Sequence, residues 1–174
     1  MKKIGFLGLG VMGLPMALNV LKKSGYPVLG FDVAQARLDQ FAAAGGETTS
    51  DPVDIYKTCD VIMQMLPTHP IIINSIKQAV QYGKPGNIIL DLDSTAPDII
   101  QELYPEVEAA GMHLLDSPVS GGNPMAIAGT LAIMTGGDKA VFEEVKPLLE
   151  CMGHPVYTGG PASGSITKLV NNMV

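Results

Sequence analysis

The chain has 174 residues, of which 47% are hydrophobic and 16% are charged. This composition indicates a single folded domain with a sizeable core and excludes an intrinsically disordered chain. The formal net charge of −6, without any basic stretch, argues against nucleic acid as a partner.

Neither the cysteines nor the N-terminus indicates an exported protein. Cys59 and Cys151 lie far apart and form no CxxC motif, so we expect two free thiols in a reducing compartment, the cytoplasm. The three histidines lack metal spacing, and we predict no metal site. The apolar run after Lys2-Lys3 is like a secretory signal, but its glycines and Pro15 would break a signal helix. No apolar run has membrane-spanning length, so we expect no membrane partner.

Short apolar runs alternate with helix-period stretches along the chain. In chain order they predict strand 3–8, helix 13–24, strand 28–32, helix 34–44, helix 51–58, strand 60–66, helix 71–82, strand 87–91, helix 97–110, strand 112–116, strand 130–135, helix 139–152, strand 155–157 and a last helix from about Ser163. This alternation predicts an α/β fold with a doubly wound, mostly parallel Rossmann-type sheet. We expect that domain over residues 1–162, followed by the start of an interdomain helix over 163–174.

A GxGxxG motif, Gly8-Leu9-Gly10-Val11-Met12-Gly13, follows the first predicted strand and opens the first predicted helix. In dinucleotide-binding domains the first glycine makes a tight turn and the second lets the pyrophosphate approach the backbone. The third glycine lets the helix pack on the strand, and the helix N-terminus attracts the phosphates. The alternative, a glycine-rich turn without a ligand, is disfavoured because an acidic residue follows at the expected distance.

That acidic residue is Asp32, which ends the second predicted strand. An acid at this place accepts a hydrogen bond from the ribose 2′-hydroxyl of NAD and repels the 2′-phosphate of NADP. Arg37, the nearest cation, is expected on a solvated helix face. The sequence therefore predicts NAD as the cofactor and disfavours NADP.

Three further loops follow predicted strands, with the sequences MLPT, DLDSTAP and DSPVSGG. Ligands of doubly wound sheets bind beyond the carboxyl ends of the strands. One such loop could be an ordinary turn, but three at the same edge indicate a binding site. Ser120, Gly121 and Gly122 form a turn rich in backbone N–H groups, which is typical of a carboxylate site.

The last residues, GSITKLVNNMV, have an apolar stripe at helical spacing. Lys168, Asn171 and Asn172 lie three and four residues apart, so their side chains are neighbours on the same helix. A helix lysine is usually an ordinary solvated side chain. The neighbouring amides make this one a candidate for proton transfer to and from a substrate hydroxyl.

Together, GFLGLGVMGLPMA, MLPT, DSPVSGG with the following AxxGTLAIMTGG, and GxxxKLVNN resemble the β-hydroxyacid dehydrogenase family, in the family's order. That family includes 3-hydroxyisobutyrate dehydrogenase and tartronate semialdehyde reductase. The resemblance implies a Rossmann-type domain, an interdomain helix and an all-helical C-terminal domain that this chain lacks. It also implies reversible, NAD(P)-dependent oxidation of a small 3-hydroxy acid to its semialdehyde, by a homo-oligomer when full length.

The resemblance further implies a role for each matching position. Gly8 to Gly13 and Asp32 would bind adenosine and pyrophosphate, and Leu66 and Pro67 would line the cofactor groove. Ser120, Gly121 and Gly122 would hold the substrate carboxylate. Lys168 would be the general acid and base, and Asn172, with Asn171, would orient the substrate and the lysine.

The chain departs from the family pattern at two places. After the expected strand 87–91, Ser94 takes the family's Ser/Thr place near the nicotinamide, with Thr95 as an alternative, and Asp93 replaces a neutral residue. In the carboxylate loop, Asn123 and Pro124 replace small residues, which would alter the substrate pocket.

Two other functions compete with this hypothesis. A non-catalytic dinucleotide-binding module would use the cofactor only as a ligand, and it would have no need of Lys168 with its two asparagines. An S-adenosylmethionine methyltransferase has glycine loops on a similar sheet, but it would not explain GxGxxG or the lysine helix. We expect this chain alone to bind NAD with little turnover, and its last turn either to fray or to pair with another copy.

Overall fold

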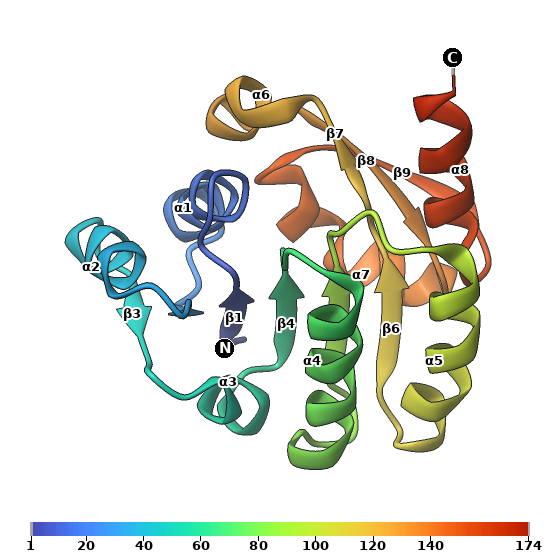
Figure 1. Ribbon diagram of the computed structural model, residues 1–174, viewed down its shortest axis with the longest axis horizontal. Helices are drawn as coiled ribbons and strands as arrows, with labels where there is room; N and C mark the ends of the chain where they lie inside the picture. The colour runs from blue at the N-terminus through green and yellow to red at the C-terminus, as the bar shows by residue number, and fades with distance from the viewer. Residues whose placement is uncertain (1, 174) are drawn as a thin grey trace.

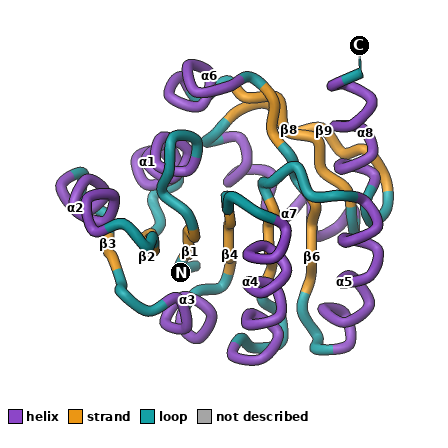
Figure 2. Tube along the Cα trace, viewed as in Figure 1, coloured by secondary structure: helices purple, strands orange, loops and turns teal. Residues whose placement is uncertain are grey.

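The computed structural model describes residues 2–173 (Figure 1). Within this range the strands are β1 (Ile4–Leu7), β2 (Val28–Phe31), β3 (Glu47–Thr48), β4 (Val61–Gln64), β5 (Ile88–Asp91), β6 (His113–Asp116), β7 (Val119–Ser120), β8 (Leu131–Gly136) and β9 (Gly153–Gly159). The helices are α1 (Gly13–Lys23), α2 (Gln35–Ala43), α3 (Pro52–Thr58), α4 (His69–Tyr82), α5 (Pro97–Ala109), α6 (Gly122–Ala128), α7 (Lys139–Glu150) and α8 (Ser163–Asn172). Figure 2 shows the helices packed around the strands.

All the strands belong to one sheet, with the order β3-β2-β1-β4-β5-β6-β8-β7 and with β9 paired to β8. The strands from β3 to β6 in this order are parallel to one another. Strand β8 runs antiparallel to β6 and β7, while β9 is parallel to β8. The predicted mostly parallel Rossmann-type sheet is therefore confirmed.

Helices cover both faces of this sheet because alternate strand residues point to opposite sides. In β1, Ile4 and Phe6 pack into a cluster with residues of α1, α2, α6 and α7, whereas Leu7 packs with residues of α3, α4 and α5. Strand β4 repeats the pattern, with Val61 in the first cluster and Ile62 in the second. Burial of a large side chain of this kind contributes about 1.5–3 kcal/mol, so the two clusters hold the strand ends in fixed positions.

The strand order reverses at β1, which lies between β2 and β4. Helices α1 and α2 cover one face of the sheet, and α3 covers the other. The chain therefore passes from β1 to β2 over the first face and comes back to β4 over the second. This arrangement opens a crevice beyond the carboxyl ends of β1 and β4, the usual ligand site of doubly wound sheets. In Figure 1 these ends point upward, toward α6 and the end of α8.

Two helices begin at aspartates that cap them locally. Asp51 accepts a hydrogen bond from the amide of Val53 at 3.0 Å at the start of α3. Asp138 accepts one from the amide of Val141 at 3.1 Å at the start of α7. Such caps satisfy amides that have no partner within the helix, and losing one costs about 1 kcal/mol.

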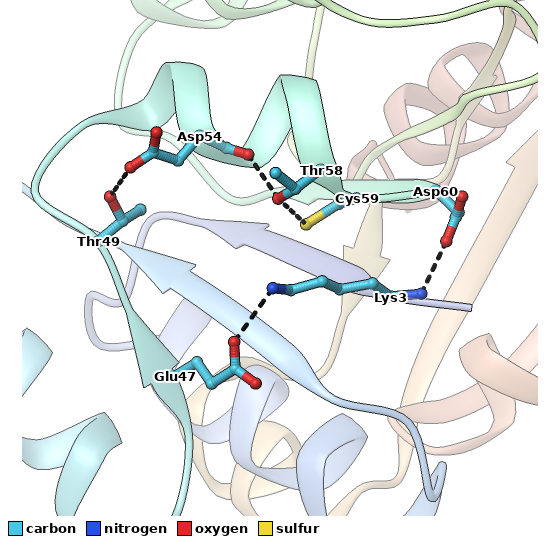
Figure 3. Close-up of polar contacts among 7 residues, drawn as sticks. All are labelled: Lys3, Glu47, Thr49, Asp54, Thr58, Cys59 and Asp60. Carbon is cyan, nitrogen blue, oxygen red and sulfur yellow. Dashed lines mark hydrogen bonds and ion pairs between the residues drawn. The ribbon is translucent and has the colours of Figure 1, made fainter. Parts of the chain in front are cut away.

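Two separate sets of polar contacts lie around β1, β3 and α3 (Figure 3). The Lys3 ammonium pairs with Glu47 at 3.1 Å, and its backbone amide donates to Asp60 at 2.8 Å. In the same view, Thr49 donates to the Asp54 carboxylate. These contacts are partly exposed, so each contributes little to stability by itself.

Three short elements were not predicted from the sequence, namely β3, β7 and α6. The segment 117–124 was expected to be a loop, but it contains β7 and begins α6. Strand 155–157 was predicted too short, because β9 pairs with β8 from Gly153 to Gly159. Pairing across the sheet thus defines elements that residue propensity alone does not indicate.

None of the helices between residues 2 and 173 combines the length and the apolar character that crossing a membrane requires.

Candidate functional site

A cavity of about 510 Å³ lies in the crevice at the carboxyl ends of β1, β2 and β4. Its walls come from the glycine loop, from the end of β2 and from the segment after β4. They comprise Gly8, Gly10, Val11, Met12, Gly13, Phe31, Asp32, Val33, Met65, Leu66, Pro67 and Ile71. We call this cavity the crevice groove. Most of the residues predicted to contact a dinucleotide line it, Leu66 and Pro67 included.

A different structural feature explains each of the three glycines in the loop. Gly8 has φ +93°, and a β-carbon there would overlap the carbonyl oxygen of Met65, so only glycine fits. A β-carbon on Gly13 would overlap the carbonyl oxygen of Gly8, so its absence lets α1 pack closely on the turn. At Gly10 a β-carbon would meet no atom within 4 Å. Gly10 lines the crevice groove, and such open space suits a backbone that a pyrophosphate must approach.

Asp32 joins the end of β2 to the glycine loop. Its carboxylate accepts from the amide of Leu9 at 2.7 Å and from the amide of Ala34 at 2.8 Å. Asp32 also lines the crevice groove, so it can receive a ribose hydroxyl there. The side chain of Leu9 is fully buried in the core, so this residue contributes to the loop through its backbone. Arg37 lies outside the crevice groove, in α2.

A pair of buried carboxyl groups stands at the end of β5. Asp91 accepts from the hydroxyl of Thr95 at 2.6 Å and from the side-chain amide of Gln64 at 3.3 Å. Asp93, 4% exposed, accepts from the amide of Leu66 at 2.8 Å and so holds one wall of the crevice groove. Burial raises the pKa of Asp91. Burial and the neighbouring charge of Asp91 raise the pKa of Asp93 to about 10.

This shift favours the protonated, neutral form of Asp93, which would then resemble the neutral residue expected at this place. Thr95 is buried and donates to Asp91, whereas Ser94 is exposed. Of these two hydroxyls, that of Ser94 is the one accessible to a ligand. It does not line the crevice groove itself.

The predicted carboxylate loop lies between β7 and α6. Gly121 and Gly122 have φ +137° and +69°, and both residues are exposed, as a turn that presents its amides requires. The side-chain amide of Asn123 donates to the carbonyl oxygen of Val11 at 2.8 Å. This contact connects the carboxylate loop to the glycine loop. The sequence did not predict it, because Asn123 and Val11 lie 112 residues apart and belong to no shared motif.

Helix α8 carries the predicted proton-transfer group. Lys168 is partly exposed, while Asn171 and Asn172 are exposed. The apolar stripe on the same helix is also exposed, with Leu169 at 51% and Val170 at 57%. The helix packs against β8 and β9 and rises at the edge where the strands end (Figure 1).

The start of α8 is attached to the end of β6 through Asp116. This carboxylate accepts from the amide of Ala162 at 3.0 Å and from the amide of Ser165 at 2.9 Å. Burial raises the pKa of Asp116, and these amide donors oppose that shift. The sequence did not predict this link, because Ala162 and Ser165 lie 46 and 49 residues after Asp116 along the chain.

No group of three or more His, Cys, Asp or Glu side chains that could hold a metal ion occurs among residues 2–173. A second hollow of about 530 Å³ lies at the opposite edge of the sheet, beside Lys2, Asp60 and Lys84. Lys84 pairs there with Asp60 at 3.8 Å. None of the predicted site residues lines this hollow.

Known proteins resemble this chain in sequence and in fold. Residues 3–160 match the family described as the NAD binding domain of 6-phosphogluconate dehydrogenase. The NAD-dependent L-serine dehydrogenase of Pseudomonas aeruginosa is 36% identical over 100% of the chain and 59% of its own length. The mitochondrial 3-hydroxyisobutyrate dehydrogenase of Homo sapiens is 38% identical over 98% of the chain and 52% of its own length.

A solved structure of 3-hydroxyisobutyrate dehydrogenase from Mycobacterium tuberculosis, with L-serine, has a TM-score of 0.94 and 34% identity. The match covers 99% of this chain and 60% of that one. The chain thus spans between about half and three fifths of the length of the relatives it matches.

Proposed function

Because the chain belongs to the NAD-binding-domain family of 6-phosphogluconate dehydrogenase, with 3-hydroxyisobutyrate dehydrogenases among its relatives, we propose that it is the cofactor half of a 3-hydroxyacid dehydrogenase. The proposed reaction is the reversible oxidation of a small 3-hydroxy acid to its semialdehyde. Residues 1–162 would form the cofactor domain, and 163–174 would begin a helix that leads into a further, substrate-covering domain.

The crevice groove supports the cofactor part of this proposal. Three chemically distinct walls meet there, namely a glycine loop at a helix N-terminus, an acid at the end of β2, and the apolar pair Leu66 and Pro67. The first suits a pyrophosphate, the second a ribose hydroxyl, and the third the face of a flat ring. The bound NAD would supply the hydride acceptor for the carbon that carries the substrate hydroxyl.

The residues of the chain would handle the substrate's acid and hydroxyl groups. The amides of Gly121 and Gly122, with the Ser120 hydroxyl, would bind the carboxylate and so orient the substrate. The Lys168 amine would take the hydroxyl proton as the hydride leaves, and return it in the reverse direction. Its cationic form would stabilise the alkoxide in reduction, and Asn172, with Asn171, would hold the hydroxyl and the ammonium in line.

The observation that carries the proposal is that α8, with Lys168, and the loop at Gly121 are both anchored to one short stretch of chain. That stretch is the end of β6, where Asp116 holds α8 and the following residues lead into the carboxylate loop. A pure cofactor-binding module has no use for a lysine and two amides at that edge. The enzyme is therefore favoured over the non-catalytic module.

The test uses Lys168→Ala and Lys168→Arg in the complete gene product. We expect both variants to lose at least about 100-fold in kcat, because proton transfer contributes 10²–10⁴-fold in enzymes of this kind. Both should bind NAD within about twofold of wild type, as measured by calorimetry, because Lys168 does not line the crevice groove. Assays would use 3-hydroxyisobutyrate, L-serine and the corresponding semialdehydes.

The matched control is Lys146→Ala, on α7 in the same chain, which should leave both quantities unchanged. Wild-type protein that binds NAD but oxidises no small hydroxy acid would favour the non-catalytic module. Retained turnover in Lys168→Ala would remove this lysine from the mechanism while leaving the reaction class in place.

A further inference from the structure

Helix α8 begins without a cap of its own. The residue before it, Ala162, has φ +69° and makes no side-chain hydrogen bond to the helix. Ala162 is the only residue other than glycine with a positive φ between residues 2 and 173. It is also fully buried, so the strained turn has no solvent to satisfy its polar groups.

A residue of β6, distant in the sequence, supplies the missing cap. Asp116, 1% exposed at the end of β6, accepts the amide of Ala162 on one carboxylate oxygen and the amide of Ser165 on the other. The two bonds measure 3.0 Å and 2.9 Å, the lengths of well-formed N–H···O bonds. One side chain thus holds both the strained residue and the first turn of α8.

The first turn of α8 also lies in close backbone contact with two strands. A β-carbon on Gly164 would overlap the carbonyl oxygen of Met134 in β8, and it would lie 2.6 Å from the carbonyl oxygen of Asp116. The first turn of α8 therefore rests directly on the ends of β6 and β8. Lys168 follows Ser165 by three residues, slightly less than one helical turn.

We propose that Asp116 is a positioning residue for the dehydrogenase reaction: it sets the place of α8, and thereby of Lys168, relative to the carboxylate loop. The loop begins four residues after Asp116 on the same stretch of chain, so a movement of α8 changes the distance between the lysine and the bound carboxylate. Asp116 is buried and would not touch the substrate. The inference rests on the proposed function, and it adds a residue to which the family resemblance assigned no role.

The test is Asp116→Asn in the complete gene product. An amide keeps the volume of the carboxylate, but its NH₂ group faces one of the two backbone N–H groups and cannot accept from it. We expect kcat to fall at least tenfold while the KM for NAD and the calorimetric Kd for NAD stay within about twofold. Hydrogen exchange at the amides of residues 163–168 should accelerate at least tenfold, with α1 unchanged.

Two comparison variants separate positioning from ordinary stability. Asp138→Ala removes the local cap of α7, a helix without a proposed catalytic group, and should lower the melting temperature without lowering kcat. Ala162→Gly, combined with Asp116→Asn, removes the strain of the left-handed turn that Asp116 holds. The double variant should recover at least part of kcat, and it is the variant to measure if the single one does not fold.

The outcomes are distinct from those that test the reaction itself. If kcat and α8 exchange in Asp116→Asn match wild type, or if NAD affinity falls together with kcat, the positioning role is wrong. Failure of the double variant to recover activity also overturns it. If wild type oxidises no hydroxy acid, the proposed function fails, and the exchange rates at 163–168 then decide by themselves whether Asp116 holds α8.

Discussion

At the scale of single residues, the buried carboxyl pair at the end of β5 shows how charge is kept out of the crevice groove. Asp91 and Asp93 are both almost fully buried, and neither takes part in an ion pair among residues 2–173. Two carboxylates in such a place cannot both ionise at neutral pH. A protonated Asp93 still accepts from Leu66, so the wall of the crevice groove is maintained without a second negative charge.

Replacing Asp93 with Asn should make stability less dependent on pH. The folded pKa of Asp93 is about 10, above its ordinary value of 3.8, so the folded state holds an extra proton between these limits. The contribution of this protonated group to the free energy of unfolding is fully present below pH 3.8, and it is lost as the pH rises toward 10. Asn keeps the acceptor for Leu66 and cannot ionise, so it imitates the protonated acid.

The measurement is urea unfolding of wild type and Asp93→Asn between pH 5 and pH 9. The free energy of unfolding of wild type should fall relative to that of the variant, by at most about 1.4 kcal/mol per pH unit. Parallel pH profiles for the two proteins would mean that Asp93 is ionised in the folded state.

At the scale of elements, the glycine loop and α1 allow the structural role of a glycine to be separated from its role in binding. Gly13→Ala places a methyl group against the carbonyl oxygen of Gly8 and should destabilise the fold by about 1–3 kcal/mol. Gly10→Ala meets no atom within 4 Å and should leave the free energy of unfolding within about 0.5 kcal/mol. It should nevertheless weaken NAD binding at least tenfold, because Gly10 lines the crevice groove and an added methyl group would keep the pyrophosphate away from its backbone.

Urea unfolding and calorimetric titration with NAD, applied to both variants, check this pair of expectations. Gly10→Ala that binds NAD like wild type would place the pyrophosphate elsewhere. Gly13→Ala with undiminished stability would mean that α1 has room to move away from the turn.

The same scale explains which elements could be predicted from the sequence. The strands with continuous apolar runs and the longer amphipathic helices follow from local periodicity, and the structure confirms them. Helix α6 does not, because its place depends on α1: Asn19 donates to the carbonyl oxygen of Ala126 at 2.8 Å, across 107 residues. For the candidate site, motifs predicted the walls of the crevice groove, whereas the links made by Asp116 and Asn123 depend on tertiary contacts that a motif does not record.

At the scale of the whole molecule, this chain supplies the glycine loop, the acid and the apolar wall of the crevice groove, so we expect the chain alone to bind the cofactor. NAD at 100 times its Kd should stabilise the folded chain by about 2.7 kcal/mol. For a chain of 174 residues this corresponds to a rise in melting temperature of about 5–10 °C. NADP at the same concentration should raise it much less, because its 2′-phosphate would meet the carboxylate of Asp32.

Thermal unfolding of the 174-residue chain with each cofactor measures this difference directly. Asp32→Asn should narrow the gap between NAD and NADP, since it removes the charge that repels the 2′-phosphate. It should also lower the melting temperature without any ligand, because one of the two amides that Asp32 accepts, those of Leu9 and Ala34, loses its acceptor. If NADP stabilises wild type as much as NAD does, Asp32 does not select the cofactor, and its main role is to fix the glycine loop.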